Sequence, residues 1–431
     1  MTGNLLLVGG NDEVLGKARD LGLRVLLLQH PDRVTPSQYE LADQLYPVDF
    51  TDWDEVQALL NRLAPEVSAA VSLTEAGLEC ASRIVDLLGL TGSGHSVIGL
   101  TRNKLAMREH LAALDPHAVP AARLVDRGDL TRFAEQHGYP LIVKPVNATA
   151  SFAVFRVAGP DQLDEVWRSV SALRGTLTAR SQLPFRIADF IIEKFVDGVE
   201  YSVESFSFHG RHVIIAVTEK FIDPASFTEV GHVLPARIPL EEEEQVRQVV
   251  IRFLDHLGVR DGVGHTEVRL GAGGLAVIET HNRPGGDAIA DLVRGAYGID
   301  LVEYTLGWPF RLVPELPDRP VPLRAASTRF LVSPAAGVIA SVVGAADAAA
   351  QPDVLAVQVN AKPGQTVRPV QDNWDRLALV AATGADPIRA MARAEEVGRR
   401  LQVRIETADG RELAAVVAAV EDVERLDRVA D

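Results

Sequence analysis

Glu267 and Glu279 are two acidic residues on runs that the sequence predicts to be neighbouring strands. Both runs are rich in β-branched and apolar residues, and a Gly-Ala-Gly-Gly turn joins them within Asp261–Asp287, as in a hairpin. Residues that face each other in a hairpin have position numbers with a constant sum. The two glutamates therefore face each other only if the loop has an odd length. Ala272-Gly273-Gly274 meets this condition and supplies a glycine for a left-handed position.

Facing carboxylates repel each other unless a cation or a proton lies between them. Mg²⁺ suits such a site because it is commonly held by one or two carboxylates together with substrate phosphates. Arg283 follows a few residues later and would face the anion that the metal holds. The alternative is a surface hairpin with solvated acids.

Lys144 is a second candidate because it interrupts the apolar strand Tyr139–Val146. A lysine in such a run must find an anion, shift its pKa or extend to the surface. The loop Asn147–Ser151 follows it, and small residues there let backbone N–H groups approach a phosphate, although glycines would do this better. Lys104, within a predicted helix Ser96–Leu114, also fits an ordinary exposed lysine.

The composition limits the class of protein. The net charge of −16 over 431 residues argues against a nucleic-acid-binding surface, but it allows a local basic pocket for a phosphorylated ligand. Cys80 is the only cysteine, so no internal disulfide can form and a reducing cytoplasm is expected. No apolar stretch approaches the length of a membrane span, and we predict no signal peptide.

The elements that must position these residues begin with a βαβ unit. Strands are predicted at residues 4–8 and 24–28 around a helix at Asp12–Leu21, and the pattern continues as an α/β domain. Its first turn, Gly9-Gly10, permits a nicotinamide oxidoreductase as an alternative. That turn lacks the full G-x-G-x-x-G spacing, and acidic residues follow where a pyrophosphate would approach.

Further along, Asp197-Gly198 between two alternating runs predicts a hairpin of Asp189–Val196 with Val199–Phe208. We expect an irregular connection over Glu219–Pro239, a helix at Leu240–Leu257 and a proline-rich linker at Pro309–Pro322. An α+β domain should follow, with strands near residues 325–332 and 377–382 and a helix at 387–401.

Five motifs then occur in the order that is typical of one family. They are Asn103-Lys104, Ile142-Val143-Lys144-Pro145, Glu193 to Glu204, His265-Thr266-Glu267, and Glu279 followed by Arg283-Pro284-Gly285-Gly286-Asp287. With them the chain resembles the ATP-grasp carboxylate–amine ligases, and among these the L-amino-acid (dipeptide) ligase group. The resemblance implies a multidomain α/β and α+β protein with the ATP-grasp fold. Its expected parts are an N-terminal Rossmann-like α/β domain (1–95), a connecting helix (96–118), a lid subdomain (119–200), a catalytic subdomain (201–310) and a C-terminal α+β domain (323–431).

The resemblance also implies roles for individual residues. Lys104 and Lys144 would contact ATP phosphates, and Lys220 would add a contact unless it is a surface lysine. Glu193, Lys194 and Val196 would form the adenine hinge, and Glu200 would bind the ribose. Glu267 and Glu279 would hold the metal, with Arg283 stabilising the transferring phosphoryl group. A weaker expectation places three residues in the substrate pocket: His232, His265 and Asp287.

Two departures from the family pattern stand out. Where the family usually has asparagine after the second metal glutamate, this chain has His281, with Asn282 one position later. Only His281 shares a strand face with Glu279, and imidazole suits Mn²⁺ better than Mg²⁺. Either His281 lies near the metal without binding it, or the backbone bends so that Asn282 reaches the metal. The phosphate loop Asn147–Ser151 contains no glycine, which questions its tight closure over ATP.

The resulting hypothesis is an ATP-dependent ligase that phosphorylates a carboxylate to an acylphosphate and joins it to an amine. Its cofactors would be ATP and Mg²⁺, or Mn²⁺. Its partners would be small-molecule acids and amines, without nucleic acid or membrane, and a homodimer is compatible with the sequence. The alternatives are a carboxylase that uses bicarbonate and a catalytically weak ATP-binding protein.

Overall fold

The computed structural model describes residues 3–115, 118–178, 183 and 185–419. Its N-terminal part is a parallel sheet with the strand order β3-β2-β1-β4. The strands are β1 (Asn4–Val8), β2 (Arg24–Gln29), β3 (Gln44–Pro47) and β4 (Val67–Val71). Helices α1 (Asp12–Asp20), α2 (Pro36–Leu41), α3 (Trp53–Leu63) and α4 (Leu78–Leu88) accompany them. Alternate residues of β1 enter separate cores on the two sheet faces, which confirms the βαβ prediction.

The helix expected over Ser96–Leu114 is two helices, α5 (His95–Arg102) and α6 (Lys104–Ala112). Asn103 between them has φ −122° and ψ 100°, and its side chain accepts a hydrogen bond from the Ala106 N–H. Asparagine favours such an N-cap because its short side chain satisfies a free backbone donor. The break places Lys104 at the first turn of α6.

A second sheet has the order β5-β10-β6-β7. Its strands are β5 (Ala121–Leu124), β6 (Leu141–Pro145), β7 (Phe155–Val157) and β10 (Phe190–Lys194), with α7 (Arg127–His137) and α8 (Leu163–Leu173) packed on them. The short strands β8 (Leu177–Thr178) and β9 (Phe185–Arg186) pair with each other. The predicted hairpin across Asp197-Gly198 is wrong, because β10 pairs with β5 and β6 while the next strand belongs to another sheet. The Asp-Gly turn marks the passage between the two sheets.

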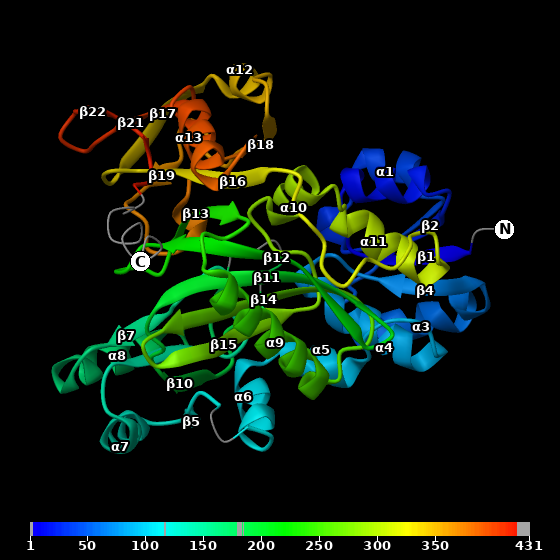
Figure 1. Ribbon diagram of the computed structural model, residues 1–431, viewed down its shortest axis with the longest axis horizontal. Coiled ribbons are helices and arrows are strands. Elements are labelled where there is room, and N and C mark those ends of the chain that lie inside the picture. Colours follow the sequence, from blue (N-terminus) through cyan, green and yellow to red (C-terminus); the bar gives the residue numbers. More distant parts are fainter. Residues whose placement is uncertain (1–2, 116–117, 179–182, 184, 420–431) are drawn as a thin grey trace.

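The largest sheet has nine strands and runs through the middle of the molecule (Figure 1). Its path is β15-β14-β11-β12-β13-β16-β20-β18, and β23 (Val416–Val417) pairs with β16. The bounds are β11 (Val199–Phe208), β12 (Arg211–Ile222), β13 (Glu229–Leu234), β14 (Gly262–Gly271), β15 (Gly274–His281), β16 (Ala325–Val332), β18 (Val354–Val359) and β20 (Ala378–Gly384). The connection expected to be irregular at 219–239 therefore contains the end of β12 and all of β13.

Helices cover the central sheet on both faces. Helix α9 (Leu240–Leu257) shares a core with β11, β12, β14 and β15, whereas α10 (Ile289–Tyr297) and α11 (Leu301–Gly307) contribute to a second core with β16 and β20. The last part of the chain adds a sheet of order β19-β17-β21-β22 and helices α12 (Ala345–Ala349) and α13 (Pro387–Gly398). These strands are β17 (Gly337–Val343), β19 (Thr366–Val367), β21 (Gln402–Glu406) and β22 (Glu412–Ala414).

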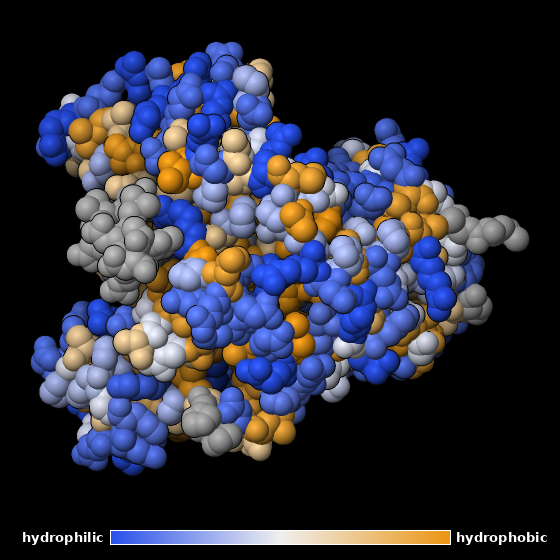
Figure 2. All heavy atoms as spheres, viewed as in Figure 1, coloured by the Kyte–Doolittle hydropathy of each residue, from blue (hydrophilic) through white to orange (hydrophobic). Residues whose placement is uncertain are grey.

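The exposed face in Figure 2 is mostly hydrophilic, and its hydrophobic residues lie in scattered groups. Within the described part of the chain, every helix is too short or too polar to cross a bilayer.

Candidate active site

Glu267 on β14 and Glu279 on β15 are direct cross-strand partners, as the sequence predicts. The route to this register differs from the expectation. The strands meet at Gly271 and Gly274 around a two-residue loop, and a β-bulge between the 267–279 and 268–277 pairs leaves Ile278 without a partner. The single extra residue that makes the two glutamates face each other therefore lies in the bulge, and not in the loop as expected. Gly274 does have a positive φ of 96°.

The lysines expected at the phosphates are both buried and both bound to acids. The Lys104 ammonium lies 2.7 Å from Glu279 Oε2 and donates to the Ala148 carbonyl oxygen at 2.8 Å. The Lys144 ammonium lies 2.6 Å from Glu193 Oε2. Burial opposes the charge on Glu193, but Arg108 and Lys144 outweigh it and lower the pKa of its carboxyl group to about 2. Neither lysine is an exposed surface residue.

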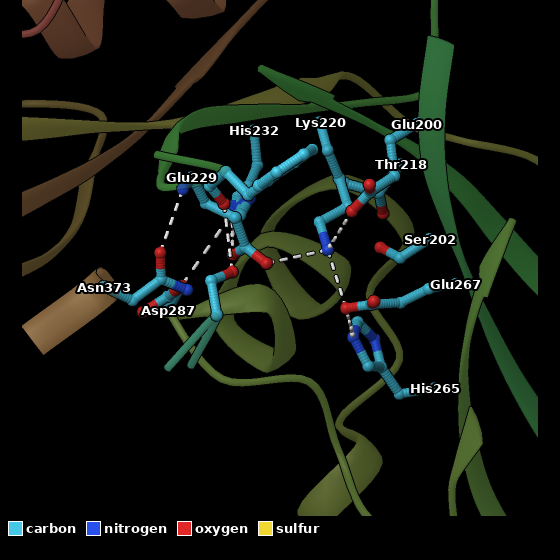
Figure 3. A network of polar contacts seen from close by, with 12 residues as sticks. Glu200, Ser202, Thr218, Lys220, Glu229, His232, His265, Glu267, Asp287 and Asn373 are labelled. Atoms are coloured by element: carbon cyan, nitrogen blue, oxygen red, sulfur yellow. Dashed lines mark hydrogen bonds and ion pairs between the residues drawn. The ribbon is translucent and has the colours of Figure 1, made fainter. Parts of the chain in front are cut away.

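Lys220 on β12 is also buried, which excludes the surface-lysine interpretation. Its ammonium lies 2.9 Å from Glu200, 2.7 Å from Glu229 and 2.7 Å from Glu267 (Figure 3). Burial disfavours this charge, yet the three carboxylates raise the pKa of Lys220 well above its usual value. Lys220 therefore joins Glu200, which is expected to bind the ribose, to Glu267, which is expected to bind the metal.

Two buried histidines near this cluster differ in charge. Burial opposes a charge on His265, but Glu204, whose Oε2 lies 2.9 Å from Nδ1, raises the pKa of this imidazole to about 9. Burial lowers the pKa of His232 to about 3, although its Nε2 lies 3.2 Å from Glu229. The two rings lie at opposite ends of the Lys220 cluster in Figure 3.

Asp287, the third residue expected in the substrate pocket, is held by Arg376 through two hydrogen bonds of 2.8 and 2.7 Å. Burial opposes its charge, but Arg376 lowers the pKa of the Asp287 carboxyl group. Because Arg376 comes from the segment before β20, this pair ties the loop after the hairpin to the C-terminal part of the chain.

Arg283 donates from Nε to Glu75 Oε2 at 2.7 Å. His281 lies on the same side, with Nε2 at 3.1 Å from Glu279 Oε1 and Nδ1 at 3.2 Å from Glu75 Oε2. Asn282 is directed elsewhere, since its amide donates to the Val263 carbonyl oxygen at 2.7 Å. The structure thus brings His281 to the acids and keeps Asn282 away from them.

Two cavities meet at these acids. The first is lined by apolar side chains that include Ile142, Phe195 and Phe227, and both Lys194 and Val196 border it. The second is a wide cleft of about 1770 Å³ that reaches from Arg283 to the turn at Gly9 and Gly10. Glu229, Glu267 and Glu279 line both, so the acidic residues stand where an apolar pocket opens into a polar cleft.

The glycine-free loop after Lys144 adopts a conformation that glycine would favour. Ala150, Ser151 and Ala153 have φ values of 61°, 55° and 56°, in the left-handed region. The Ala150 carbonyl accepts a hydrogen bond from the Asn373 N–H at 3.1 Å, and the Ser151 hydroxyl donates to the Phe227 carbonyl oxygen at 2.9 Å. These contacts hold the loop beside the apolar cavity despite its missing glycines.

Sequence reasoning missed several residues of the site. Glu75 follows β4, and the carboxyl end of a parallel strand is where ligands usually bind, so this signal could have been used. The remaining missed residues, Arg108, Glu204, Glu229 and Arg376, come from segments whose proximity depends on sheet register and helix packing.

Two protein families match the chain. Residues 137–291 match the ATP-grasp domain, and residues 329–406 match the L-amino acid ligase C-terminal domain 2. Human carnosine synthase 1 is 28% identical over an alignment of 345 positions that covers 74% of this chain and 41% of that protein. Alanine–anticapsin ligase of Bacillus subtilis (strain 168) is 23% identical over an alignment of 239 positions that covers 52% of this chain and 50% of the ligase. The chain thus spans about half or less of the length of these relatives.

The solved structures agree in fold. The L-amino acid ligase from Bacillus licheniformis superposes with a TM-score of 0.79 at 22% identity, covering 93% of this chain and 98% of the other. The phosphoribosylglycinamide synthetase from Anaerococcus prevotii gives a TM-score of 0.70 at 16% identity, covering 94% and 99%. These matches place an ATP-grasp domain at residues 137–291 and an L-amino acid ligase C-terminal domain 2 at residues 329–406, and the solved structures share the fold of the chain.

Proposed function

We propose that this protein is an ATP-dependent carboxylate–amine ligase that activates an acid, such as an amino acid, and joins it to an amine. The observation that carries the proposal is the position of Glu267 and Glu279, which face each other where the apolar cavity opens into the polar cleft. The named functions of carnosine synthase 1, alanine–anticapsin ligase and the L-amino acid ligase support the same reaction class.

In this proposal the adenine occupies the apolar cavity beside Lys194 and Val196, and Glu200 receives the ribose hydroxyls. Lys104 and Lys144 bind the phosphates, for which they must exchange their bonds to Glu279 and Glu193. Lys220 orders Glu200 and Glu267 and gives a further positive charge near the phosphates. The segment of roughly 119–200 acts as a lid that excludes water from the intermediate.

The carboxylate oxygens of Glu267 and Glu279 are hard ligands that fit Mg²⁺, which would neutralise charge on the transferring phosphoryl group when bound. Asn282 is bonded to the Val263 carbonyl oxygen, and both ring nitrogens of His281 lie within 3.2 Å of acids. We therefore assign the metal to the two glutamates and give His281 the role of holding Glu279 and Glu75.

The acid substrate would enter from the wide cleft, where Arg283 faces the phosphoryl group under transfer. Phosphorylation converts a carboxylate oxygen that does not leave into a phosphate that does, and the amine then displaces that phosphate. His232, His265 and Asp287 line or support the cleft for the two substrates. Cys80 is buried and alone, which supports a cytoplasmic location.

The test is ADP formation with Mg²⁺ and a panel of amino acids, offered singly and in pairs, with bicarbonate alone as a separate arm. We expect ADP and phosphate with amino acids, which supply both a carboxylate and an amine, and neither product with bicarbonate alone. Arg283→Ala should keep ATP binding and reduce ADP formation by about 10²- to 10³-fold, the usual cost of losing one group that stabilises developing charge. ADP formation with bicarbonate alone, or an Arg283→Ala variant with full turnover, would contradict the proposal.

A further inference from the structure

Arg108 on α6 is a buried arginine that none of the roles above uses. Its guanidinium group makes three hydrogen bonds to two other elements. Nε donates to Glu193 Oε1 at 2.7 Å on β10. Nη1 donates to the Val277 carbonyl oxygen at 2.8 Å, and Nη2 donates to the Ile278 carbonyl oxygen at 3.0 Å, both on β15.

The two carbonyl groups belong to the β-bulge that sets the register of the acids. Below the bulge Val268 pairs with Val277, and above it Glu267 pairs with Glu279, so Ile278 is the extra residue. Without the bulge Glu267 would face Ile278, and Glu279 would project from the opposite side of the sheet. β15 is the edge strand of the sheet, and at its bulge, where the ladder is locally disrupted, the two η nitrogens of Arg108 donate to the carbonyl oxygens of Val277 and Ile278.

The bond from Arg108 to Glu193 also fixes the position of Lys144. Glu193 accepts from Arg108 through Oε1 and from Lys144 through Oε2. The carboxylate is therefore fixed on both sides, and the ammonium of Lys144 is held beside the apolar cavity. One guanidinium group thus contacts both Glu193, which holds Lys144, and the bulge that places Glu279.

We propose that Arg108 is a positioning residue that holds the bulge in the register that brings Glu279 opposite Glu267, and that it also fixes Lys144 through Glu193. This inference rests on the proposed function, because it takes the two acids to be the metal ligands. Arginine is required at this place since its planar fork donates in several fixed directions, whereas the single ammonium of lysine can replace the bond to Glu193 but cannot span both carbonyl groups.

The experiment separates metal binding from nucleotide binding. Mn²⁺ binding is measured by the loss of the free Mn²⁺ signal in electron paramagnetic resonance, with ADP present. ADP binding without metal is measured by fluorescence with a labelled analogue. We expect Arg108→Lys to bind Mn²⁺ about 10- to 100-fold more weakly than the wild type, as is usual when a group supporting a metal ligand is lost, while its ADP affinity changes little. Arg108→Met should lose affinity for both.

Arg247 on α9 provides the matched control. It is also buried, it lies 2.7 Å from Glu243 and it donates to the Ile214 carbonyl oxygen at 2.8 Å, outside both cavities. Arg247→Met should lose stability in thermal unfolding to an extent similar to Arg108→Met, yet bind Mn²⁺ and ADP like the wild type.

The outcomes are distinct. Weak Mn²⁺ binding by Arg108→Lys with preserved ADP binding and wild-type binding by Arg247→Met would support the inference. Equal Mn²⁺ affinity in Arg108→Lys and the wild type would overturn it, and so would an equal loss of Mn²⁺ binding in Arg247→Met. A wild-type protein that bound no Mn²⁺ in the presence of ADP would instead refute the proposed function itself.

Discussion

Replacing Lys220 by methionine would remove the cation from a buried group of three acids. The lysine side chain is only 1% exposed, and its ammonium is within 2.9 Å of Glu200, Glu229 and Glu267. One oxygen from each of these carboxylates lies within 4.8 Å of the others. Methionine matches the length of the lysine stem, so the variant loses the charge and keeps most of the packing.

The expected cost follows from the burial of the cluster. Removing one partner of a buried ion pair typically destabilises a protein by about 3–5 kcal/mol, because the charge left behind has neither water nor a counter-ion. Here three carboxylates lose the same partner, while Glu200 keeps Arg269 at 2.9 Å and Glu267 keeps His265 at 3.7 Å, so we expect Lys220→Met to fall within that range near neutral pH.

The cost should also depend on pH. In the wild type burial opposes the charge on Glu267, but Lys220 lowers the pKa of this carboxyl group, so it is charged throughout the neutral range and its stabilising contribution is lost only in acid. In the variant, burial and repulsion by Glu279 raise the pKa of Glu267 above that of the unfolded chain. The protonated form of Glu267 then favours the folded state, so the deficit of the variant should shrink as the pH falls from about 8 to about 5.

The assay is denaturant titration of both proteins in buffer that contains EDTA, at several pH values, with unfolding monitored by tryptophan fluorescence. Lys17→Met is the control, because Lys17 pairs with Asp300 at 2.6 Å but is 23% exposed and should cost about 1 kcal/mol or less. Addition of Mg²⁺ or Mn²⁺ in place of EDTA should restore stability to Lys220→Met, since the three oxygens could then hold a cation. A deficit below about 1 kcal/mol, or one that grows as the pH falls, would refute the reasoning.

Three further predictions concern the surroundings of the acids. Burial opposes the charge on His265, but Glu204 raises the pKa of this imidazole from 6.5 to about 9. The stabilising contribution of His265 is therefore complete below pH 6.5 and is lost as the pH rises through 9. In denaturant titrations, His265→Gln should remove this pH dependence of the unfolding free energy. Gly285→Ala should cost about 1–3 kcal/mol and slow ADP formation, because the added Cβ would lie 2.7 Å from His265 Nδ1, whereas Gly286→Ala meets nothing within 4 Å and should be nearly neutral. Ala153→Gly should be neutral or stabilising by up to about 1 kcal/mol in thermal unfolding, because it relieves a φ of 56°, while Ala134→Gly inside α7 should lose about 1 kcal/mol.

The facing pair of glutamates could be predicted from the sequence because strand alternation allows only two arrangements. Glycines mark the turn, and either Glu279 faces Glu267 or it lies on the other side of the sheet. The bulge at Ile278 could not be predicted, since it has no residue signature in this hairpin. Arg108, which satisfies the bulge, lies 169 positions from Val277.

The apolar surroundings of Lys144 leave an anionic partner, a shifted pKa and extension to the surface open, and the structure shows a buried lysine with an anionic partner. The sequence could not assign Lys220 in the same way, because its acids come from different strands and their distances depend on three registers in one sheet. The hairpin predicted at Asp197-Gly198 shows the opposite error. A local turn signal is independent of which sheet each strand joins, and here Gly198 lies so close to the Leu270 carbonyl oxygen that an added Cβ would be 2.2 Å from it.

The ladder between β13 and β16 has a consequence for protein engineering. Gly231 to Leu234 pair with Arg329 to Ala326, so the C-terminal region continues the sheet that carries the β14–β15 hairpin. A chimera that exchanged this region with that of a relative would have to rebuild a hydrogen-bonded strand junction as well as the Asp287–Arg376 link. If the proposed function holds, point substitutions in the cleft would therefore alter substrate preference with less damage to the fold than an exchange of the C-terminal region.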